Sequence, residues 1–244
     1  MAKTAAALVI GNEILTGKVA EANVLVLARE LFGLGIELRR IVVCPDEVDT
    51  IAADLKALAD THDVVVTSGG VGPTHDDVTI KAVAQAFGVR IVRAEAYTTL
   101  LRDYYGERLT DMHLRMADVP EGARLAMTQD NRWPTVVMRN VYVFPGVPQI
   151  FAGKVSVLRA ELASGARFHS RAVYVRLDEP TLAPLLDRLA AGHPDVNIGS
   201  YLTWDKAADY DTKLTVDGRS SAAVEACMGE LLCGIASTLV VRIE

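Results

Sequence analysis

A glycine-rich segment that ends in two carboxylates, residues 67–79, carries the clearest chemical signal in the sequence. It lies between an apolar β-branched run, residues 64–66, and a helix-like stretch, residues 80–87. A strand, a glycine-rich turn and a helix start form the layout that proteins use to hold phosphate groups. Glycines also let the backbone approach a ligand closely, because no Cβ stands in the way. We therefore expect a phosphate site in this loop.

Two adjacent carboxylates, Asp76 and Asp77, end the loop. They would repel a phosphate unless a divalent cation stood between them. The pair therefore predicts a phosphorylated ligand handled together with a metal ion, with both aspartates as metal ligands and catalytic groups. The structural alternative is that Gly-Gly and Gly-Pro form ordinary turns and that Asp77 caps the next helix. The length of the loop and its acidic pair favour the functional interpretation.

Several loop residues are expected to contact the ligand. Those with small or hydroxyl-bearing side chains are Ser68, Gly69, Gly70, Gly72, Pro73, Thr74 and Thr79. Lys81 follows in the first turn of the helix and can pair with phosphate, although a solvated lysine explains its position equally well. His75 can contact a phosphate too, but a loop histidine without a ligand is the commoner case. No serine, cysteine or histidine arrangement indicates nucleophilic catalysis.

The first part of the chain alternates strands and helices, which must position this loop. The expected strands are residues 5–10, 36–44 and 63–67, and the expected helices are residues 22–34, 48–58 and 78–87. This alternation predicts an α/β fold, a doubly wound, mostly parallel sheet with helices on both faces. Ligands of such sheets bind at the carboxyl ends of the strands.

The carboxyl ends of all three expected strands carry acidic residues. The first strand runs into Gly11, Asn12 and Glu13, the second ends near Asp46, and the third feeds the glycine loop. Three acidic strand ends beside one crevice indicate a site for a metal ion and a polyphosphate. Asp46 and Glu13 are therefore candidates for a general base or for support of the metal ion.

Two stretches beyond the loop have no expected chemistry. Residues 94–116 have the pattern of an amphipathic helix, in which core packing explains Tyr97 and Tyr104. Residues 124–140 are expected to be irregular.

A second turn offers another candidate anion contact. A strand, residues 141–144, runs into Pro145 and Gly146, and a helix is expected over residues 149–162. Backbone amides at a helix start can bind an anion. A purely structural turn is about as consistent with this composition.

The pattern changes near residue 165, which predicts two domains, residues 1–165 and 166–244. The expected elements of the second domain are strands 171–177, 197–203, 211–216 and 238–243 and helices 181–191 and 220–232. This β-α-β-β-α-β order is the split arrangement of small α+β, ferredoxin-like domains. We expect this domain to line one side of the site or to form a subunit contact.

Composition excludes some classes of function. The 244 residues include 25 basic and 31 acidic ones, a net charge of −6, so we expect no nucleic-acid binding. No apolar run reaches the roughly 20 residues that span a bilayer, and the N-terminal apolar stretch is too short for a signal peptide. The spacing of Cys44, Cys227 and Cys233 fits no metal site. Three cysteines leave at least one unpaired in any disulfide scheme, which favours a reducing cytoplasm as the location.

The motifs resemble a known family. Residues 68–79 resemble the signature of the molybdopterin-binding fold of molybdenum-cofactor biosynthesis proteins, and residues 11–17 with Asn23 resemble the first motif of the competence-damage-inducible protein A branch. The similarity is closest to the N-terminal, molybdopterin-binding-like domain of eukaryotic FAD synthases. Further stretches that fit this branch are residues 45–48, 82–88, 139–146, 168–170 and 199–201.

The resemblance implies a metal-dependent pyrophosphatase that releases AMP from FAD or ADP-ribose. Magnesium, manganese or cobalt, together with potassium, would be its cofactors, and a dimer or trimer its assembly. The alternative is a molybdopterin-binding protein of molybdenum-cofactor metabolism without hydrolase activity. The resemblance adds Gly11, Asn12 and Asn23 to the residues expected to bind a nucleotide or pterin phosphate. It stops before any adenylyltransferase domain, so FAD synthesis is not expected.

Two positions depart from the family pattern. The first motif usually reads Gly-Asp-Glu, whereas this chain has Gly11-Asn12-Glu13. An amide oxygen coordinates a cation but brings no charge, so this change gives the binding alternative some weight. Around Trp133 and Pro134 the Thr-Ala-Pro-Gly segment of the bacterial branch is replaced, which favours the FAD synthase side and affects the base or flavin end of the ligand.

Overall fold

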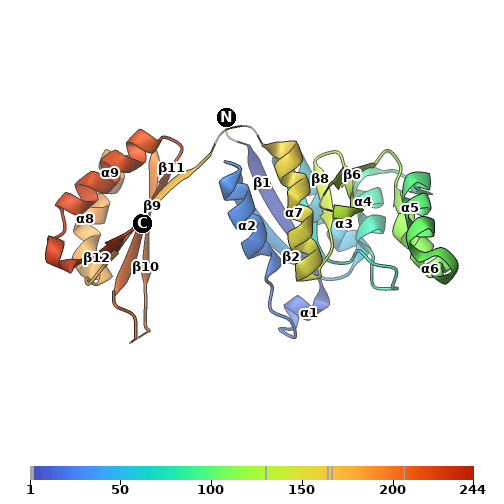
Figure 1. Cartoon of the computed structure of the whole chain (residues 1–244), viewed down its shortest axis with the longest axis horizontal. Coiled ribbons are helices and arrows are strands. Elements are labelled where there is room, and N and C mark those ends of the chain that lie inside the picture. The colour runs from blue at the N-terminus through green and yellow to red at the C-terminus, as the bar shows by residue number, and fades with distance from the viewer. Residues whose placement is uncertain (1–2, 130, 164, 166, 206) are drawn as a thin grey trace. The chain divides into compact units, whose positions relative to one another are not determined.

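The computed structural model describes residues 3–129, 131–163, 165, 167–205 and 207–244 (Figure 1). The side chain of Arg132 also lies outside this description. The chain divides into two compact units, Met1–Gly165 and Ala166–Glu244. No described helix is long and apolar enough to cross a membrane.

The sheet of the first unit is mostly parallel, as expected. Its strands lie side by side in the order β2 (Glu37–Cys44), β1 (Thr4–Ile10), β3 (Val64–Ser68), β8 (Val141–Phe144), β7 (Asn131–Met138) and β6 (Arg124–Thr128). The pairings from β2 to β8 are parallel, whereas β7 and β6 continue the sheet as an antiparallel ribbon. The predicted α/β fold with a mostly parallel sheet is therefore confirmed.

Helices cover both faces of this sheet because its central strands are apolar on both sides. Alternate residues of β1 enter separate cores, with Ala7 in one and Leu8 in the other. The helices are α2 (Asn23–Gly33) and α7 (Pro148–Leu162) on the first face, and α3 (Val48–Thr61) and α4 (Thr79–Phe87) on the second (Figure 1). A short helix, α1 (Asn12–Leu15), follows β1.

The expectation that residues 124–140 are irregular is wrong. Residues 124–128 and 131–138 form the antiparallel strands β6 and β7, with Leu125 opposite Val136. Polar residues and Pro134 hide the alternation in the sequence. The register between the two strands shifts between Ala126 and Thr128, close to the proline. A residue without an N–H is tolerated at such an irregularity.

The single helix expected over residues 94–116 is also wrong, because Gly106 interrupts it. The segment consists of α5 (Glu95–Tyr105), η1 (Gly106–Arg108), α6 (Asp111–Leu114) and η2 (Arg115–Ala117), which we call the α5–η2 segment. Gly106 has φ 53°, a conformation that favours glycine and ends α5. The segment is flanked by two short strands, β4 (Ile91–Arg93) and β5 (Asp118–Pro120), which pair with each other. In Figure 1 it extends beyond α4.

The second unit has the predicted β-α-β-β-α-β order. Its antiparallel sheet has the strand order β10 (Val196–Leu202), β11 (Thr212–Gly218), β9 (His169–Val175) and β12 (Val240–Ile243). Helices α8 (Glu179–Gly192) and α9 (Ser221–Cys233) pack on it over an apolar core that includes Val173, Val175 and Leu214. This arrangement confirms the predicted smaller α+β domain.

Candidate functional site

The carboxyl ends of four parallel strands meet at one edge of the first sheet. Two backbone hydrogen bonds extend the pairing beyond the strands. The Gly11 amide donates to the Cys44 carbonyl and the Gly69 amide to the Phe144 carbonyl, each at 3.2 Å. The segments that follow β1, β2, β3 and β8 therefore lie next to one another, and with them most of the residues predicted to form the site.

The ends of β1 and β2 are joined through Asp46. The backbone amide of Asn12 donates to Asp46 Oδ2 at 2.8 Å, so this contact does not depend on the Asn12 side chain. A Cβ on Gly11 would lie 2.5 Å from the Glu13 carboxylate, a flexible group that can move aside. Burial, with the charges of Asp54 and Asp46, raises the pKa of the neighbouring Cys44 thiol to about 12, so this thiol is no nucleophile.

Asn23 holds three of these segments together. Its side chain is buried, and Nδ2 donates to Ser68 Oγ at 2.9 Å and to the Gly146 carbonyl at 2.8 Å. Its Oδ1 is buried and has no hydrogen-bond partner among the described residues. Glu13, Asn23, Ser68 and Gly146 line a small cavity of about 60 Å³ here. These predicted site residues thus lie together, behind the glycine loop.

The glycine loop has a backbone that other residues adopt only with strain. Gly69 has φ 111° and Gly70 has φ 63°, and a Cβ on Gly69 would lie 2.1 Å from the Ile10 carbonyl oxygen. Thr79 closes the loop, because its hydroxyl donates to the Gly69 carbonyl at 2.8 Å and its amide to the Gly70 carbonyl at 3.1 Å. Thr79 is fully buried, so its side chain holds the loop from behind.

The rest of the loop bends around the carboxylate of Asp77. The Thr74 amide donates to Asp77 Oδ2 at 2.9 Å, and the Thr74 hydroxyl donates to the same oxygen. A Cβ on Gly72 would lie 2.4 Å from this oxygen. Asp77 is half-buried and fixed, whereas the side chains of Asp76 and His75 are 65% and 98% exposed. The two predicted metal ligands therefore have different surroundings.

A cavity of about 310 Å³, which we call the polar cavity, opens in front of the loop. It is lined by Gly70, Gly72, Pro73, Thr74, Asp77, Ile80, Lys81, Ile91, Arg115 and Asp118. Six of these ten residues were predicted from the sequence. In the described part of the chain Lys81 and Arg115 form no ion pair, whereas Asp118 is bound to Arg93 at 2.5 Å. The cavity therefore holds two available cations beside one fixed carboxylate.

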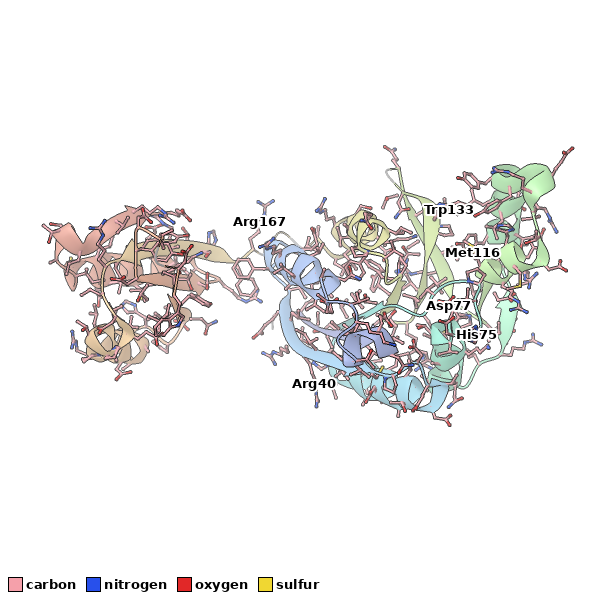
Figure 2. The ribbon with its side chains drawn as sticks, turned by 90° about the horizontal axis from the view of Figure 1, so that it is seen from below. Arg40, His75, Asp77, Met116, Trp133 and Arg167 are labelled. Carbon is pink, nitrogen blue, oxygen red and sulfur yellow. The ribbon has the colours of Figure 1, made fainter. Side chains whose placement is uncertain are left out.

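A second cavity of about 320 Å³, the aromatic cavity, adjoins the first and shares Gly72, Ile80, Arg115 and Asp118 with it. Its other lining residues are Val71, Tyr97, Tyr104, Tyr105, Met116, Trp133, Pro134, Val136, Val143, Pro145, Ile150 and Lys154. The rings of Tyr104 and Trp133 meet edge to face, with centroids 4.9 Å apart. In Figure 2, Trp133, Met116 and Asp77 lie in the same part of the first unit, away from Arg40.

Sequence reasoning missed most of the aromatic cavity. Tyr97 packs in a small core with Leu101, as expected, but it also lines the cavity. Arg115 was missed because it lies in η2, within a segment predicted as one continuous helix. Trp133 was singled out as a departure from the family pattern, and this was the one available signal.

The donor set for a metal ion is small. In the described ranges no group of three or more His, Cys, Asp or Glu side chains is placed to hold one. Mg²⁺ is usually bound through one or two carboxylates, several waters and the substrate phosphates. Asp77 fits this mode, because its Oδ1 accepts no hydrogen bond from the described residues. Asp76, by contrast, is not among the residues that line the polar cavity.

Models of protein families match both units. Residues 6–162 match a family described as "Probable molybdopterin binding domain", and residues 167–244 match "FAD synthase, middle domain". The first match covers more than half of the chain.

Individual proteins are similar over most of the chain or of their own length. A protein of Archaeoglobus fulgidus is 31% identical over 193 residues, which are 79% of this chain and 82% of that protein. A "Probable FAD synthase" of Caenorhabditis elegans is 34% identical over 95% of this chain, which spans 50% of that relative. The crystal structure of the protein CinA with unknown function from Thermoplasma acidophilum matches with a TM-score of 0.60 and 30% identity, covering 66% of this chain and 98% of that one.

Proposed function

The chain belongs to the family described as "Probable molybdopterin binding domain", and we propose that it is a metal-dependent pyrophosphatase that releases AMP from FAD or ADP-ribose. The observation that carries this proposal is the polar cavity. Asp77, Lys81 and Arg115 line it together with the glycine loop. A pyrophosphate is a compact, strongly negative group, and one fixed carboxylate with two cations suits its binding together with a divalent ion.

The glycine loop and the cations would bind and orient the pyrophosphate. Loop amides would hold one phosphate, while Lys81 and Arg115 would neutralise charge that develops on the other. A divalent ion bound by Asp77 would supply charge neutralisation and a more acidic water. Thr74 fixes the Asp77 carboxylate for this task through its amide and its hydroxyl.

Asp46 and Glu13 remain the candidates for accepting a proton from the attacking water, although neither is among the residues that line the polar cavity. Both lie at the carboxyl ends of strands, and the Asn12 amide fixes one oxygen of Asp46. A covalent mechanism through the nearest thiol is disfavoured, since burial keeps Cys44 protonated. The proposed reaction is therefore direct attack of water on phosphorus.

Similarity to FAD synthases supports FAD as a ligand. The relative from Caenorhabditis elegans matches almost the whole chain, but the chain spans only half of that protein. We therefore include FAD among the proposed substrates of this chain.

Binding without hydrolysis is the second candidate function. It is favoured by Asn12, which stands where the family usually has an aspartate, because the amide lowers the charge available to a metal ion. In this case the same loop would hold a molybdopterin or another pterin phosphate.

The test is AMP release from FAD and from ADP-ribose by the full chain, with Mg²⁺, Mn²⁺ or Co²⁺ and with K⁺. We expect metal-dependent release that EDTA abolishes and that Asp77→Asn lowers at least hundredfold. Asp60→Asn is the matched control, because Asp60 is an exposed aspartate on α3 that pairs with Lys56. Asp76→Asn separates the two predicted metal ligands, and a larger loss there than in Asp77→Asn would reverse their assignment.

Two other results would change the conclusion. Release restored only by Asn12→Asp would mean that the hydrolytic site has lost its activity in this chain. If neither the unmodified chain nor Asn12→Asp releases AMP, but the chain binds a pterin phosphate, the binding function is favoured.

A further inference from the structure

Lys154 is the least expected residue in the wall of the aromatic cavity. Its side chain is only 4% exposed, and Nζ donates to the carbonyl of Trp133 at 2.5 Å and to that of Pro134 at 2.8 Å. An ammonium group has three donors, so these carbonyls leave one unused. Within the described residues no carboxylate pairs with it. Buried lysines without a charged partner are rare because they cost stability.

The other charged and titratable groups of the cavity do not neutralise this ammonium group. These groups are Tyr97, Tyr104, Tyr105, Arg115 and Asp118. The Asp118 carboxylate is bound to Arg93, and burial raises the pKa of Tyr97 to about 12, so that its hydroxyl is neutral. With Arg115 the cavity therefore offers two cations. Burial lowers the pKa of Lys154 to about 8, which leaves it mostly charged at neutral pH.

Flat aromatic side chains form much of the remaining wall. Trp133 meets Tyr104 edge to face, and its ring centroid lies 6.4 Å from that of Tyr97. Such walls favour a flat ring as ligand. The volume of about 320 Å³ is near the lower end of the roughly 300–1,000 Å³ of ligand pockets, which suits one ring system. Trp133 links both features, because its carbonyl holds Lys154 while its indole forms the wall.

We propose that the aromatic cavity binds the flat heteroaromatic ring of the ligand, and that Lys154 selects a ring with carbonyl oxygens on its edge, as in a flavin, over adenine. The ammonium group only donates hydrogen bonds. A flavin edge offers it carbonyl acceptors, whereas adenine offers only ring nitrogens, and its amino group is itself a donor. This inference rests on the proposed function, since a pyrophosphate in the polar cavity brings the attached half of the same ligand to the shared wall.

The arrangement predicts a preference among substrates. In FAD the flavin half would enter the aromatic cavity, whereas the corresponding half of ADP-ribose ends in a ribose that carries no aromatic ring. FAD and ADP-ribose contain the same pyrophosphate group but would thus differ in binding, and FAD would have the lower KM.

Riboflavin is the probe that tests the ring site alone, because it has no phosphate and needs no metal ion. We expect the full chain to bind riboflavin with quenching of flavin fluorescence, and adenosine not to compete. Lys154→Met keeps a side chain of similar length but removes the charge, and should weaken binding about ten- to hundredfold. Lys56→Met, at an exposed lysine of α3, is the matched control and should bind as the unmodified chain does.

A second variant covers the case in which Lys154→Met does not fold. Tyr104 is 44% exposed on α5, so Tyr104→Leu changes the cavity wall with little effect on the core, and it should also weaken riboflavin binding. The effect of Lys154 should fade as the pH rises above about 8, because the neutral amine keeps two donors for the two carbonyls.

Binding of adenosine in place of riboflavin, or equal riboflavin affinity in Lys154→Met and Lys56→Met, would overturn the inference. Hydrolysis of FAD without riboflavin binding would refute the ring site alone. Riboflavin binding that depends on Lys154, without any hydrolysis, would refute the pyrophosphatase and leave the ring site standing.

Discussion

The two adjoining cavities of the first unit are built in different ways. The polar cavity is formed largely by one continuous loop, whose backbone is fixed by Thr74, Asp77 and Thr79. The aromatic cavity is formed by residues of several separate elements, chiefly the α5–η2 segment, β7 and α7. A change in the loop should therefore disturb folding and catalysis together. A change in the aromatic wall should alter which ligand binds.

The largest expected effect is that of Gly69→Ala. The new Cβ would lie 2.1 Å from the Ile10 carbonyl, which belongs to the central strand β1 and cannot move away. We expect the free energy of unfolding to fall by about 3 kcal/mol or more. Urea unfolding of the first unit, followed by Trp133 fluorescence in a Trp204→Phe background, measures this change.

Gly153→Ala is the control for this prediction. Gly153 lies inside α7, and a Cβ there would meet no described atom within 4 Å. Alanine should stabilise the helix by roughly 0.5–1 kcal/mol. Equal stability of the two variants would mean that the loop is not rigid, and the contrast between the cavities would fail.

The next effect concerns Lys154 and the cost of its burial. Burial lowers its pKa to about 8 in the folded chain, against an ordinary value of 10.5. Between these values the unfolded chain binds a proton that the folded chain lacks, so stability rises with pH. The chain should therefore gain up to about 3 kcal/mol over Lys154→Met between pH 8 and pH 10.5.

Urea unfolding at several pH values measures this difference. Lys56→Met, which changes an exposed lysine, should show no such pH-dependent difference from the unmodified chain. A difference in unfolding free energy between the unmodified chain and Lys154→Met that does not change with pH would mean that water reaches the ammonium group. The group would then not be kept dry for a ligand. The pH dependence thus tests the aromatic cavity without any ligand.

The same contrast explains what the sequence could predict. The glycine loop was recognised because its chemistry lies in consecutive residues, and the strands before it because they are continuous apolar runs. The link between Lys154 and the Trp133 carbonyl joins two elements, and no local pattern reports it. The strand that contains Trp133 was itself hidden, because Pro134 and polar neighbours break its alternation. Arg115 was missed for a similar reason, because the helix break at Gly106 places it in η2 and not in one continuous helix.

The smallest expected effect on stability is that of Asn12→Asp. Asp46 accepts from the backbone amide of Asn12, so the substitution keeps this hydrogen bond, and the exposed position should change stability by less than about 0.5 kcal/mol. The added charge beside Asp46 should instead raise the affinity for Mg²⁺ or Mn²⁺, because carboxylates bind these ions better than amides.

Metal-dependent AMP release, titrated with each ion, measures this effect, and riboflavin binding is the internal comparison. We expect half-maximal activity at a lower ion concentration and unchanged riboflavin affinity. A shift in riboflavin affinity would mean that the ends of β1 and β2 are coupled to the aromatic cavity, although Asn12 and Asp46 line neither of the two cavities. An unchanged ion dependence would instead place the metal ion at Asp77 alone, away from the ends of β1 and β2.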